Sequence, residues 1–292
     1  MKIKTLRDTL FQHEQVNFLL TNRVPRMLLT RWMGRISKIK QPWVAATLIT
    51  IWKAFSDLDL REARKTGFDS LHDCFVRELK DGARPIDQRP NVLCSPSDGI
   101  VMAFGSIAAQ TLVQAKGLTY TLADLLGDAD LGQRWEGGCY VTLRLTSSMY
   151  HRFHAPHDLV LDGVTHIHGD TWNVNPVALK RIARLYCRNE RAVIHLHTQD
   201  SGAELALVAV AAILVAGIRL HCLPEVLTAH YRGPTHMACS QRAAKGEELG
   251  WFEHGSTIIV LAPKGFDPTA GLAIGGTVRM GQALLLDNAK TL

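Results

Sequence analysis

The sequence contains no apolar run long enough to cross a bilayer. Its longest run, residues 205–218, holds 14 residues between Glu204 and Arg219, whereas a spanning helix needs ~20. The first ten residues also lack a continuous apolar stretch with a small-residue cleavage site, so no secretory signal peptide is predicted. We expect residues 205–218 to form a buried core strand that bends at Gly217.

Cysteine is present but dispersed, without a CxxC pair or a compact framework. This distribution argues against a disulfide scaffold and against a zinc knuckle, and it is typical of reduced thiols in a cytoplasmic protein. Internal repeats and low-complexity tracts are also missing from the sequence. The cysteines are Cys74, Cys94, Cys139, Cys187, Cys222 and Cys239.

Acidic residues are scarce at the N-terminal end. Residues 1–53 contain ten Lys and Arg but only Asp8 and Glu14 as acids, a net charge of +8. Because the whole chain of 292 residues carries +6, the remainder carries −2. The basicity therefore belongs to one end of the protein, and it indicates contact with an anionic surface, either a membrane or a nucleic acid.

The basic segment also has the pattern of amphipathic helices. Residues 5–20 and 24–40 are predicted to be helical, and the second helix carries apolar side chains and a tryptophan on one arc, with cations on its flank. Residues 43–52, flanked by tryptophans and preceded by Pro42, are too short to span a bilayer but suit its interface. The arc comprises Leu28, Trp32, Ile36 and Ile39, and the flanking cations are Arg31, Arg35 and Lys38.

This pattern favours interfacial helices on an anionic membrane, where each Lys or Arg near the surface adds roughly 1 kcal/mol. The alternative is a helix that packs its apolar arc on the protein core and leaves its charges in water. We predict no nucleic-acid partner, because aliphatic and aromatic residues dominate the contact face and no recognised binding motif is present.

Beyond a boundary near residues 55–68 the sequence changes to mostly β patterns. One helix is predicted over residues 70–80, with Asp69 or Ser70 as its N-cap, and another over residues 177–186. Alternating or continuous apolar residues predict the strands. These are residues 140–145, 159–168, 192–197, 205–218, 257–261 and 277–286.

The predicted fold class is α+β. A helical, amphipathic, membrane-binding segment (residues 1–60) is followed by a β-rich catalytic body (residues 61–292).

A candidate reactive residue, Ser256, lies at the start of one predicted strand. It follows Gly255, which has no side chain and lets another group approach its carbonyl. This placement suits attack of the Ser256 hydroxyl on the carbonyl of residue 255, and it suits an external ester poorly because the G-x-S-x-G elbow of serine hydrolases is missing. The alternative is an ordinary turn before a strand.

Three other features could join this serine in chemistry. Asp98 lies in an Asp-Gly turn that opens a strand. His151 and His154 would share one face of a helical turn that ends at Pro156, where they could act as base and acid, bind a metal, or merely cap the turn. Together, Asp, His and Ser are the components of an activated nucleophile.

Two His-x-His pairs make zinc conceivable, because alternation on a strand places each pair on one face. They are His166 with His168 and His195 with His197. No carboxylate or thiol completes either set at close spacing, so we predict no metal site.

These residues together resemble the bacterial-type, pyruvoyl-dependent phosphatidylserine decarboxylases, which are made as proenzymes. The resemblance covers about residues 68–286, with the motifs in the family's order. Residues 150–156 (YHRFHAP) resemble Y-H-R-x-H-x-P, and residues 250–257 (GWFEHGST) resemble G-x-F-x-x-G-S-T. The other matching segments are residues 74–80, 82–86, 95–99, 114–117, 173–176 and 189–191.

The resemblance implies a self-processing triad of Asp98, His154 and Ser256. His154 would take the Ser256 proton while Asp98 holds the imidazole, and cleavage at Gly255–Ser256 would yield a β chain (residues 1–255) and an α chain (residues 256–292). Residue 256 would become a covalent pyruvoyl group, which forms a Schiff base with phosphatidylserine and acts as an electron sink while CO2 leaves. His151 matches the residue that reprotonates the α-carbon before phosphatidylethanolamine is released.

The resemblance further implies a homodimer. Because no transit peptide is clear, we expect peripheral binding to the cytoplasmic face of the bacterial inner membrane, with an organellar enzyme as the alternative. At the cleavage site His254 replaces the commoner leucine, and Ser97 is a milder change beside Asp98. Two alternatives stay open: a membrane-binding homologue that does not process, and a lipid hydrolase that uses the histidines and a serine.

Overall fold

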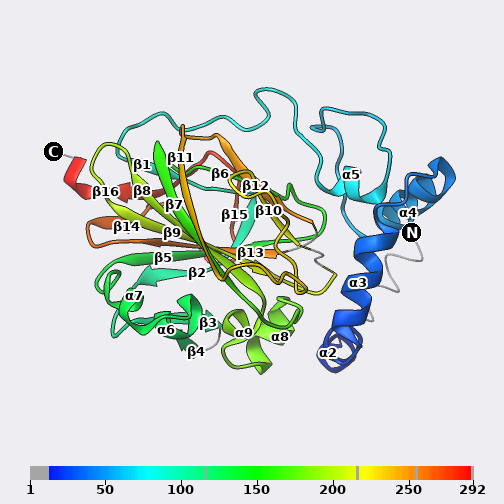
Figure 1. Cartoon of the computed structure of the whole chain (residues 1–292), viewed down its shortest axis with the longest axis horizontal. Helices are drawn as coiled ribbons and strands as arrows, with labels where there is room; N and C mark the ends of the chain where they lie inside the picture. The colour runs from blue at the N-terminus through cyan, green and yellow to red at the C-terminus, as the bar shows by residue number, and fades with distance from the viewer. Residues whose placement is uncertain (1–12, 116, 215–216, 254–255, 291–292) are drawn as a thin grey trace.

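The computed structural model describes residues 13–115, 117–214, 217–253 and 256–290. A set of helices from the N-terminal part of the chain lies at one end of a β-rich body, and the last described residues lie at the opposite end (Figure 1). This arrangement confirms the predicted α+β class, with a helical N-terminal segment and a β-rich remainder.

The N-terminal helices follow the predicted pattern closely. Helix α2 (Glu14–Asn22) covers the described part of the first predicted helix, and residues 5–12 of that prediction lie outside the described residues. Helix α3 (Arg26–Ile36) lies within the second predicted helix. The run at residues 43–52 belongs to helix α4 (Pro42–Phe55), which begins at a proline because that position needs no amide donor.

The prediction of a helix over residues 70–80 is wrong in length. Helix α5 (Leu71–Phe75) has five residues, and the Ser70 side chain caps it by accepting a hydrogen bond from the Asp73 amide. The chain then leaves the helix so that Leu79 can pair with Ala63 in an isolated antiparallel bridge. Tertiary pairing therefore overrides the local helical pattern.

An antiparallel eight-stranded sheet forms the centre of the body, in the order β11-β7-β8-β9-β13-β5-β2-β15. All seven residues of β13 are buried, because the strand lies between β9 and β5. Because a central strand is covered on both faces, its residues are apolar without interruption, as the sequence after Ser256 is. The strands are β11 (His236–Ala243), β7 (Leu159–Ile167), β8 (Arg191–Thr198), β9 (Glu204–Ala211), β13 (Ser256–Ala262), β5 (Cys139–Leu145), β2 (Gly99–Ser106) and β15 (Thr277–Val278).

Smaller elements surround this sheet. Two three-stranded sheets comprise β10 (Ile218–Leu220), β12 (Glu248–Phe252) and β6 (Arg152–His154), and β1 (Val92–Cys94), β16 (Ala283–Asp287) and β14 (Phe266–Pro268). The hairpin and short helices are β3 (Thr111–Ala115), β4 (Leu118–Thr121), α6 (Leu122–Leu126), α7 (Ala129–Gln133), α8 (Pro176–Arg181), α9 (Leu185–Arg188) and the 3-10 helix η1 (Asn288–Lys290). All six cysteines are free thiols.

Three predicted elements are divided in the structure. The run at residues 205–218 is not one bent strand, because β9 ends at Ala211 and β10 belongs to a different sheet. The segment 277–286 supplies β15 and β16 to separate sheets. The helix predicted over residues 177–186 is split into α8 and α9 by Arg184, whose backbone is left-handed with φ 54°. The strands predicted at residues 140–145, 159–168, 192–197 and 257–261 are confirmed.

Polar contacts attach the N-terminal helices to the body. Arg26 forms an ion pair of 2.6 Å with Asp170, and its guanidinium lies 3.6 Å from the centre of the Trp172 ring. Lys38 forms an ion pair of 2.8 Å with Glu253, whose side chain is only 5% exposed. The second contact joins the end of α3 to the residue that follows β12.

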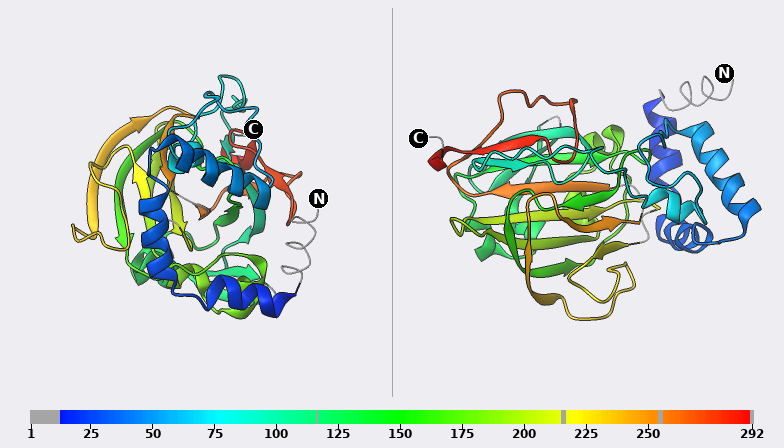
Figure 2. Two further views of the ribbon diagram at one scale, coloured as in Figure 1. Left: turned by 90° about the vertical axis from the view of Figure 1, so that its right-hand side faces the viewer. Right: turned by 90° about the horizontal axis from the view of Figure 1, so that it is seen from above.

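The outer surface of these helices is apolar. Seen end-on, the helices cross the end of the body, and the side view shows them stacked beyond it (Figure 2). None of the helices among the described residues is long and apolar enough to cross a membrane. The exposed large apolar side chains of α2 to α4 and their connections are Leu19, Leu20, Met27, Leu28, Leu29, Trp32, Ile39, Trp43, Ile51 and Phe55.

Removing the Lys38 charge is expected to destabilise the protein. Lys38→Met leaves the buried Glu253 carboxylate without its cation, which should lower the free energy of unfolding by about 1–3 kcal/mol, a value below that of a fully buried pair because Lys38 is half exposed. Chemical denaturation measures the loss.

The double variant Lys38→Met/Glu253→Gln should recover most of that loss, because the buried charge is gone. The control Arg61→Met breaks an ion pair with Asp59 at the surface and should have no measurable effect. A double variant no more stable than Lys38→Met would contradict the ionic explanation.

Candidate functional site

Ser256 is held by backbone pairing on both sides. It opens β13 opposite Leu145 of β5 and Ala211 of β9, and its side chain is completely buried. The hydroxyl has no hydrogen-bond partner among the described residues. Gly255 and His254 lie outside the described residues. A buried hydroxyl without a partner costs free energy, and such groups occur where chemistry requires them.

Ser256 lies in the wall of a cavity of about 580 Å³ between the N-terminal helices and the body. The helices contribute mostly apolar side chains, whereas the body contributes several polar ones. The lining residues from helices α2 to α5 are Asn17, Thr21, Met33, Leu48, Ile51, Trp52, Leu71 and Phe75. Those from the body are Arg144, Leu145, Thr146, Ser147, Asn173, Val174, Asn175, Ala212, Ile213, Leu214 and Ser256.

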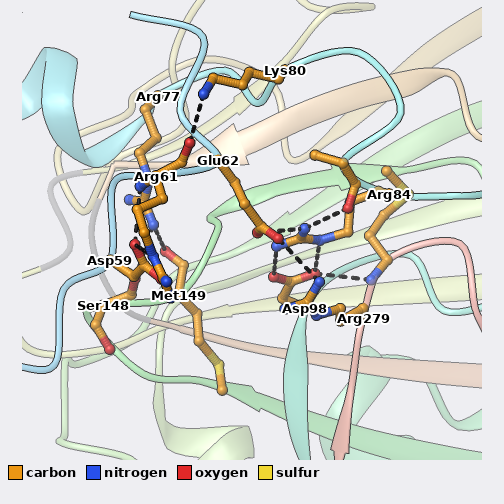
Figure 3. A network of polar contacts seen from close by, with 12 residues as sticks. Asp59, Arg61, Glu62, Arg77, Lys80, Arg84, Asp98, Ser148, Met149 and Arg279 are labelled. Atoms are coloured by element: carbon orange, nitrogen blue, oxygen red, sulfur yellow. Dashed lines mark hydrogen bonds and ion pairs between the residues drawn. The ribbon is translucent and has the colours of Figure 1, made fainter. Parts of the chain in front are cut away.

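Asp98 is in the predicted turn, directly before β2. Arg84 donates two hydrogen bonds to its carboxylate, of 2.8 and 2.6 Å, and the Met280 amide donates a third of 2.9 Å. Figure 3 shows the Arg84 guanidinium between the carboxylates of Asp98 and Glu62, with Arg279 also bound to Glu62. Burial opposes the charge of Arg84, but these two carboxylates raise its pKa above the usual value.

His154 ends strand β6, so the prediction of a helical turn for the histidine pair is wrong. The backbone is extended here because β6 pairs with β12, and the His154 amide donates to the Pro96 carbonyl at 2.7 Å, two residues before Asp98. The Nδ1 atom lies 2.9 Å from the Gly246 carbonyl, so Nδ1 carries the proton. Nε2 is then the basic nitrogen, and it accepts a hydrogen bond of 2.9 Å from the Tyr150 hydroxyl.

The surroundings of His154 favour the neutral imidazole. Burial lowers the pKa of His154 below its usual value of 6.5, and the hydrogen bond to Gly246 only partly offsets this effect. A histidine that is neutral at pH 7 can accept a proton, as a general base must.

His151 contacts a residue of the Ser256 cavity but is not among the described residues that line it. Its ring centre is 4.1 Å from that of Phe75, which lines the cavity. Its Nδ1 is 2.9 Å from the Met149 carbonyl, and its own carbonyl accepts a hydrogen bond from Phe252, at the end of β12. His151 is fully buried.

The structure brings the segments of these residues together without joining their side chains in one chain of hydrogen bonds. On strand β5, Leu145 pairs with Ser256 of β13 and the adjacent Arg144 pairs with Ile100 of β2, two residues after Asp98. His154 contacts the Asp98 turn through Pro96. The hydrogen bonds of Asp98 go to Arg84 and Met280, however, and those of the His154 ring go to Tyr150 and Gly246. His154 lines a separate cavity of about 350 Å³.

Sequence reasoning did not single out Arg84, Tyr150 or Arg144. The first two lie inside the motifs at residues 82–86 and 150–156, so their presence there was a usable signal. Arg144 lies within a predicted strand, and its contribution to the cavity depends on β5 pairing with β13.

The paired histidines have partners other than a metal. His166 contacts Glu190 at 3.1 Å in a buried pair, whereas His195 contacts Thr165 and His197 contacts Asp162. Among the described residues no group of three or more His, Cys, Asp or Glu is arranged to hold a metal ion.

Comparison with known proteins gives a consistent result. The family model for phosphatidylserine decarboxylase matches residues 71–286. A phosphatidylserine decarboxylase proenzyme of Brevibacillus brevis is 34% identical over 275 residues, which cover 92% of this chain and 97% of the relative. Proenzymes of the same name from Psychrobacter arcticus and Pseudomonas aeruginosa are 36% and 34% identical, and cover 91% and 90% of this chain and 96% and 94% of the relatives.

The relatives share a name that describes a lipid decarboxylase made as a precursor, and the match spans the segments that contain Asp98, His151, His154 and Ser256. The resemblance inferred from the motifs is therefore confirmed. The chain belongs to the phosphatidylserine decarboxylase family.

Proposed function

We propose that this protein cleaves itself between Gly255 and Ser256 and then converts phosphatidylserine to phosphatidylethanolamine and CO2. The observation that carries the proposal is the buried Ser256 hydroxyl, which has no partner among the described residues and lies at the wall of a cavity with an apolar side. A lipid with a polar headgroup fits such a cavity better than a wholly polar substrate does. The family membership supports the same reaction.

Self-processing would start at the Ser256 oxygen. It attacks the carbonyl carbon of Gly255, and the C–N bond breaks to leave an ester and a free amine on residue 256. Elimination then breaks the Cβ–O bond, which releases a chain of residues 1–255 with a terminal carboxylate and leaves dehydroalanine at residue 256. Water converts this residue to a terminal ketone, and ammonia is lost.

His154 is the proposed base, because burial keeps it neutral and its Nε2 is unprotonated. In this role, Nε2 must lose its hydrogen bond with the Tyr150 hydroxyl and accept the proton of Ser256 instead. The side chains must therefore move before the reaction. Asp98 is proposed as the residue that supports His154, and its bonds to Arg84 and Met280 fix the position of the turn from which it acts.

The surroundings of residue 256 suit a pyruvoyl group. The Ser256 side chain occupies a buried place beside the cavity, and the ketone derived from it would supply an electrophilic carbonyl and an electron sink for decarboxylation. His151 is proposed to deliver the proton to the substrate α-carbon, since its ring packs on Phe75 of the same cavity.

The membrane is the proposed source of the substrate. Helices α2 to α4 combine exposed aromatic and aliphatic side chains with an excess of cations, as an interfacial segment on anionic lipid requires. We therefore propose peripheral binding at the cytoplasmic face of the bacterial inner membrane by residues 1–60, with residues 61–292 as the catalytic domain. A homodimer stays part of the proposal on the family resemblance alone.

Replacement of Ser256 should abolish cleavage. In Ser256→Ala no oxygen can attack residue 255, so denaturing electrophoresis should show one full-length chain, whereas the wild type gives two. The control Ser201→Ala, at an exposed turn of the body, should be cleaved normally. Cleavage of Ser256→Ala, or an uncut wild type with full decarboxylase activity, would refute the proposed processing.

The rate of self-processing should depend on pH through His154. Because burial lowers the pKa of His154 below its usual value of 6.5, the imidazole is largely neutral between pH 8 and 7.5 and gains a proton on acidification. Precursor made by cell-free translation should therefore mature at a constant rate over that range and more slowly in more acidic buffer. His154→Gln should not mature, and the surface variant His230→Gln should retain the wild-type profile. A rate that rises on acidification would exclude His154 as the base.

Loss of an exposed tryptophan should weaken membrane binding. Trp43 is 74% exposed, so Trp43→Ser should reduce the partition of the protein onto phosphatidylglycerol-containing vesicles by about tenfold or more. The control Ile274→Ser removes a side chain that is 70% exposed on the body. Vesicle sedimentation measures both, and equal losses would contradict binding through the helices.

A further inference from the structure

Arg144 is a charged residue in a cavity wall that is otherwise neutral. It lies in β5, next to Leu145, and lines the 580 Å³ cavity together with Ser256. No other Lys or Arg and no Asp or Glu belongs to the described lining of this cavity. The cavity therefore has a single positive charge on the side formed by the body.

The Arg144 guanidinium has no counter-charge within the described part of the chain. No hydrogen bond or ion pair joins it to another described residue, and its Nε atom is buried without a partner. Burial lowers the pKa of Arg144, and the nearby Tyr186 only partly offsets this effect. By contrast, Arg64 and Arg84, which line the neighbouring cavity, are each bound to carboxylates.

A buried guanidinium without hydrogen-bond partners lowers the stability of the protein unless a bound ligand supplies those partners. An arginine has five N–H donors in a planar fork that matches the oxygens of a phosphate or a carboxylate. A buried cation that has no partner in the described part of the chain and lies in a ligand-sized cavity thus indicates that the bound molecule brings an anion.

The register of β5 and β13 places this cation beside the proposed reaction centre. Arg144 is directly opposite Thr257, and Leu145 is opposite Ser256. Successive side chains alternate between the two faces of a sheet, so Arg144 and Ser256 leave the paired strands on opposite faces. Both nevertheless line the cavity at the end of the sheet, so one molecule in the cavity can contact both residues.

We propose that Arg144 binds the phosphodiester of the lipid substrate and thereby sets its preference for a glycerophospholipid headgroup. This inference rests on the proposed function. The phosphodiester is the better choice of the two anions in phosphatidylserine, because it keeps its charge throughout the reaction. The carboxylate loses its charge as CO2 leaves, so a cation bound to it would stabilise the substrate more than the transition state and slow the reaction.

The test uses the full processed protein with dioctanoyl phosphatidylserine in detergent micelles. Arg144→Gln should raise the KM by about 10- to 100-fold, as expected for the loss of charge-assisted hydrogen bonds, with a smaller change in kcat. Arg144→Lys, which keeps the charge but loses the planar fork, should fall between this variant and the wild type. The control Arg134→Gln removes an exposed arginine paired with Glu204 on the body and should leave both constants unchanged.

Dioctanoyl phosphatidylethanolamine, which has the phosphodiester but no carboxylate, identifies the anion. Its inhibition constant should increase in Arg144→Gln by the same factor as the KM. An increase in KM without any change in this inhibition would assign Arg144 to the carboxylate and overturn the proposal, as would unchanged constants for both lipids. If Arg144→Gln does not fold, the same comparison made with Arg144→Lys decides between these outcomes.

The proposed function can fail separately from this inference. Electrophoresis of Arg144→Gln should show the same two chains as the wild type, because Arg144 has no part in cleavage. An uncut wild-type chain would reject the proposed function, whereas normally cleaved variants with unchanged lipid constants would reject only the role of Arg144.

Discussion

The burial of Ser256 between two paired strands is the constraint on which the rest of the site depends. Hydrogen bonding of β13 to β5 and β9 fixes the backbone of this residue, and no described residue forms a hydrogen bond with its buried hydroxyl. A polar group kept in this condition costs stability, and the apolar strand that follows it offsets that cost. The fold thus holds one reactive atom at a defined place beside a cavity.

The N-terminal helices complete this cavity and form its apolar side. Their attachment through Arg26 and Lys38 is polar and specific, which leaves their outer surface free to present aromatic and aliphatic side chains. The same helices therefore serve both surfaces, with Trp52 and Phe75 facing the cavity and Trp32 and Trp43 facing outward. In the proposed function, this arrangement lets a lipid pass from the membrane interface towards residue 256.

The sequence allowed much of this to be predicted, because the relevant signals are local. The continuous apolar run after Ser256 predicted a buried strand, and the arc of Leu28 and Trp32 predicted an amphipathic helix, since burial pattern and periodicity are properties of neighbouring residues. Asp98 was correctly placed in a turn before a strand for the same reason.

The failures have a common physical cause, which is pairing between distant segments. His154 lies on a strand because β12 pairs with it, and α5 stops early because Leu79 pairs with Ala63. The position of Arg144 in the cavity wall likewise depends on a partner strand more than a hundred residues away. Spacing within the chain holds no information about such contacts.

The most direct test of the central claim is the intact mass of the smaller chain from freshly purified wild-type protein. Self-cleavage at Gly255–Ser256 with formation of a terminal ketone predicts a fragment that begins at residue 256 and is lighter by one ammonia than the same fragment with an N-terminal serine. Reduction with borohydride should add two hydrogens to it and abolish decarboxylation. A fully active protein that consists of one uncut chain, or a small chain that retains its serine, would contradict the claim.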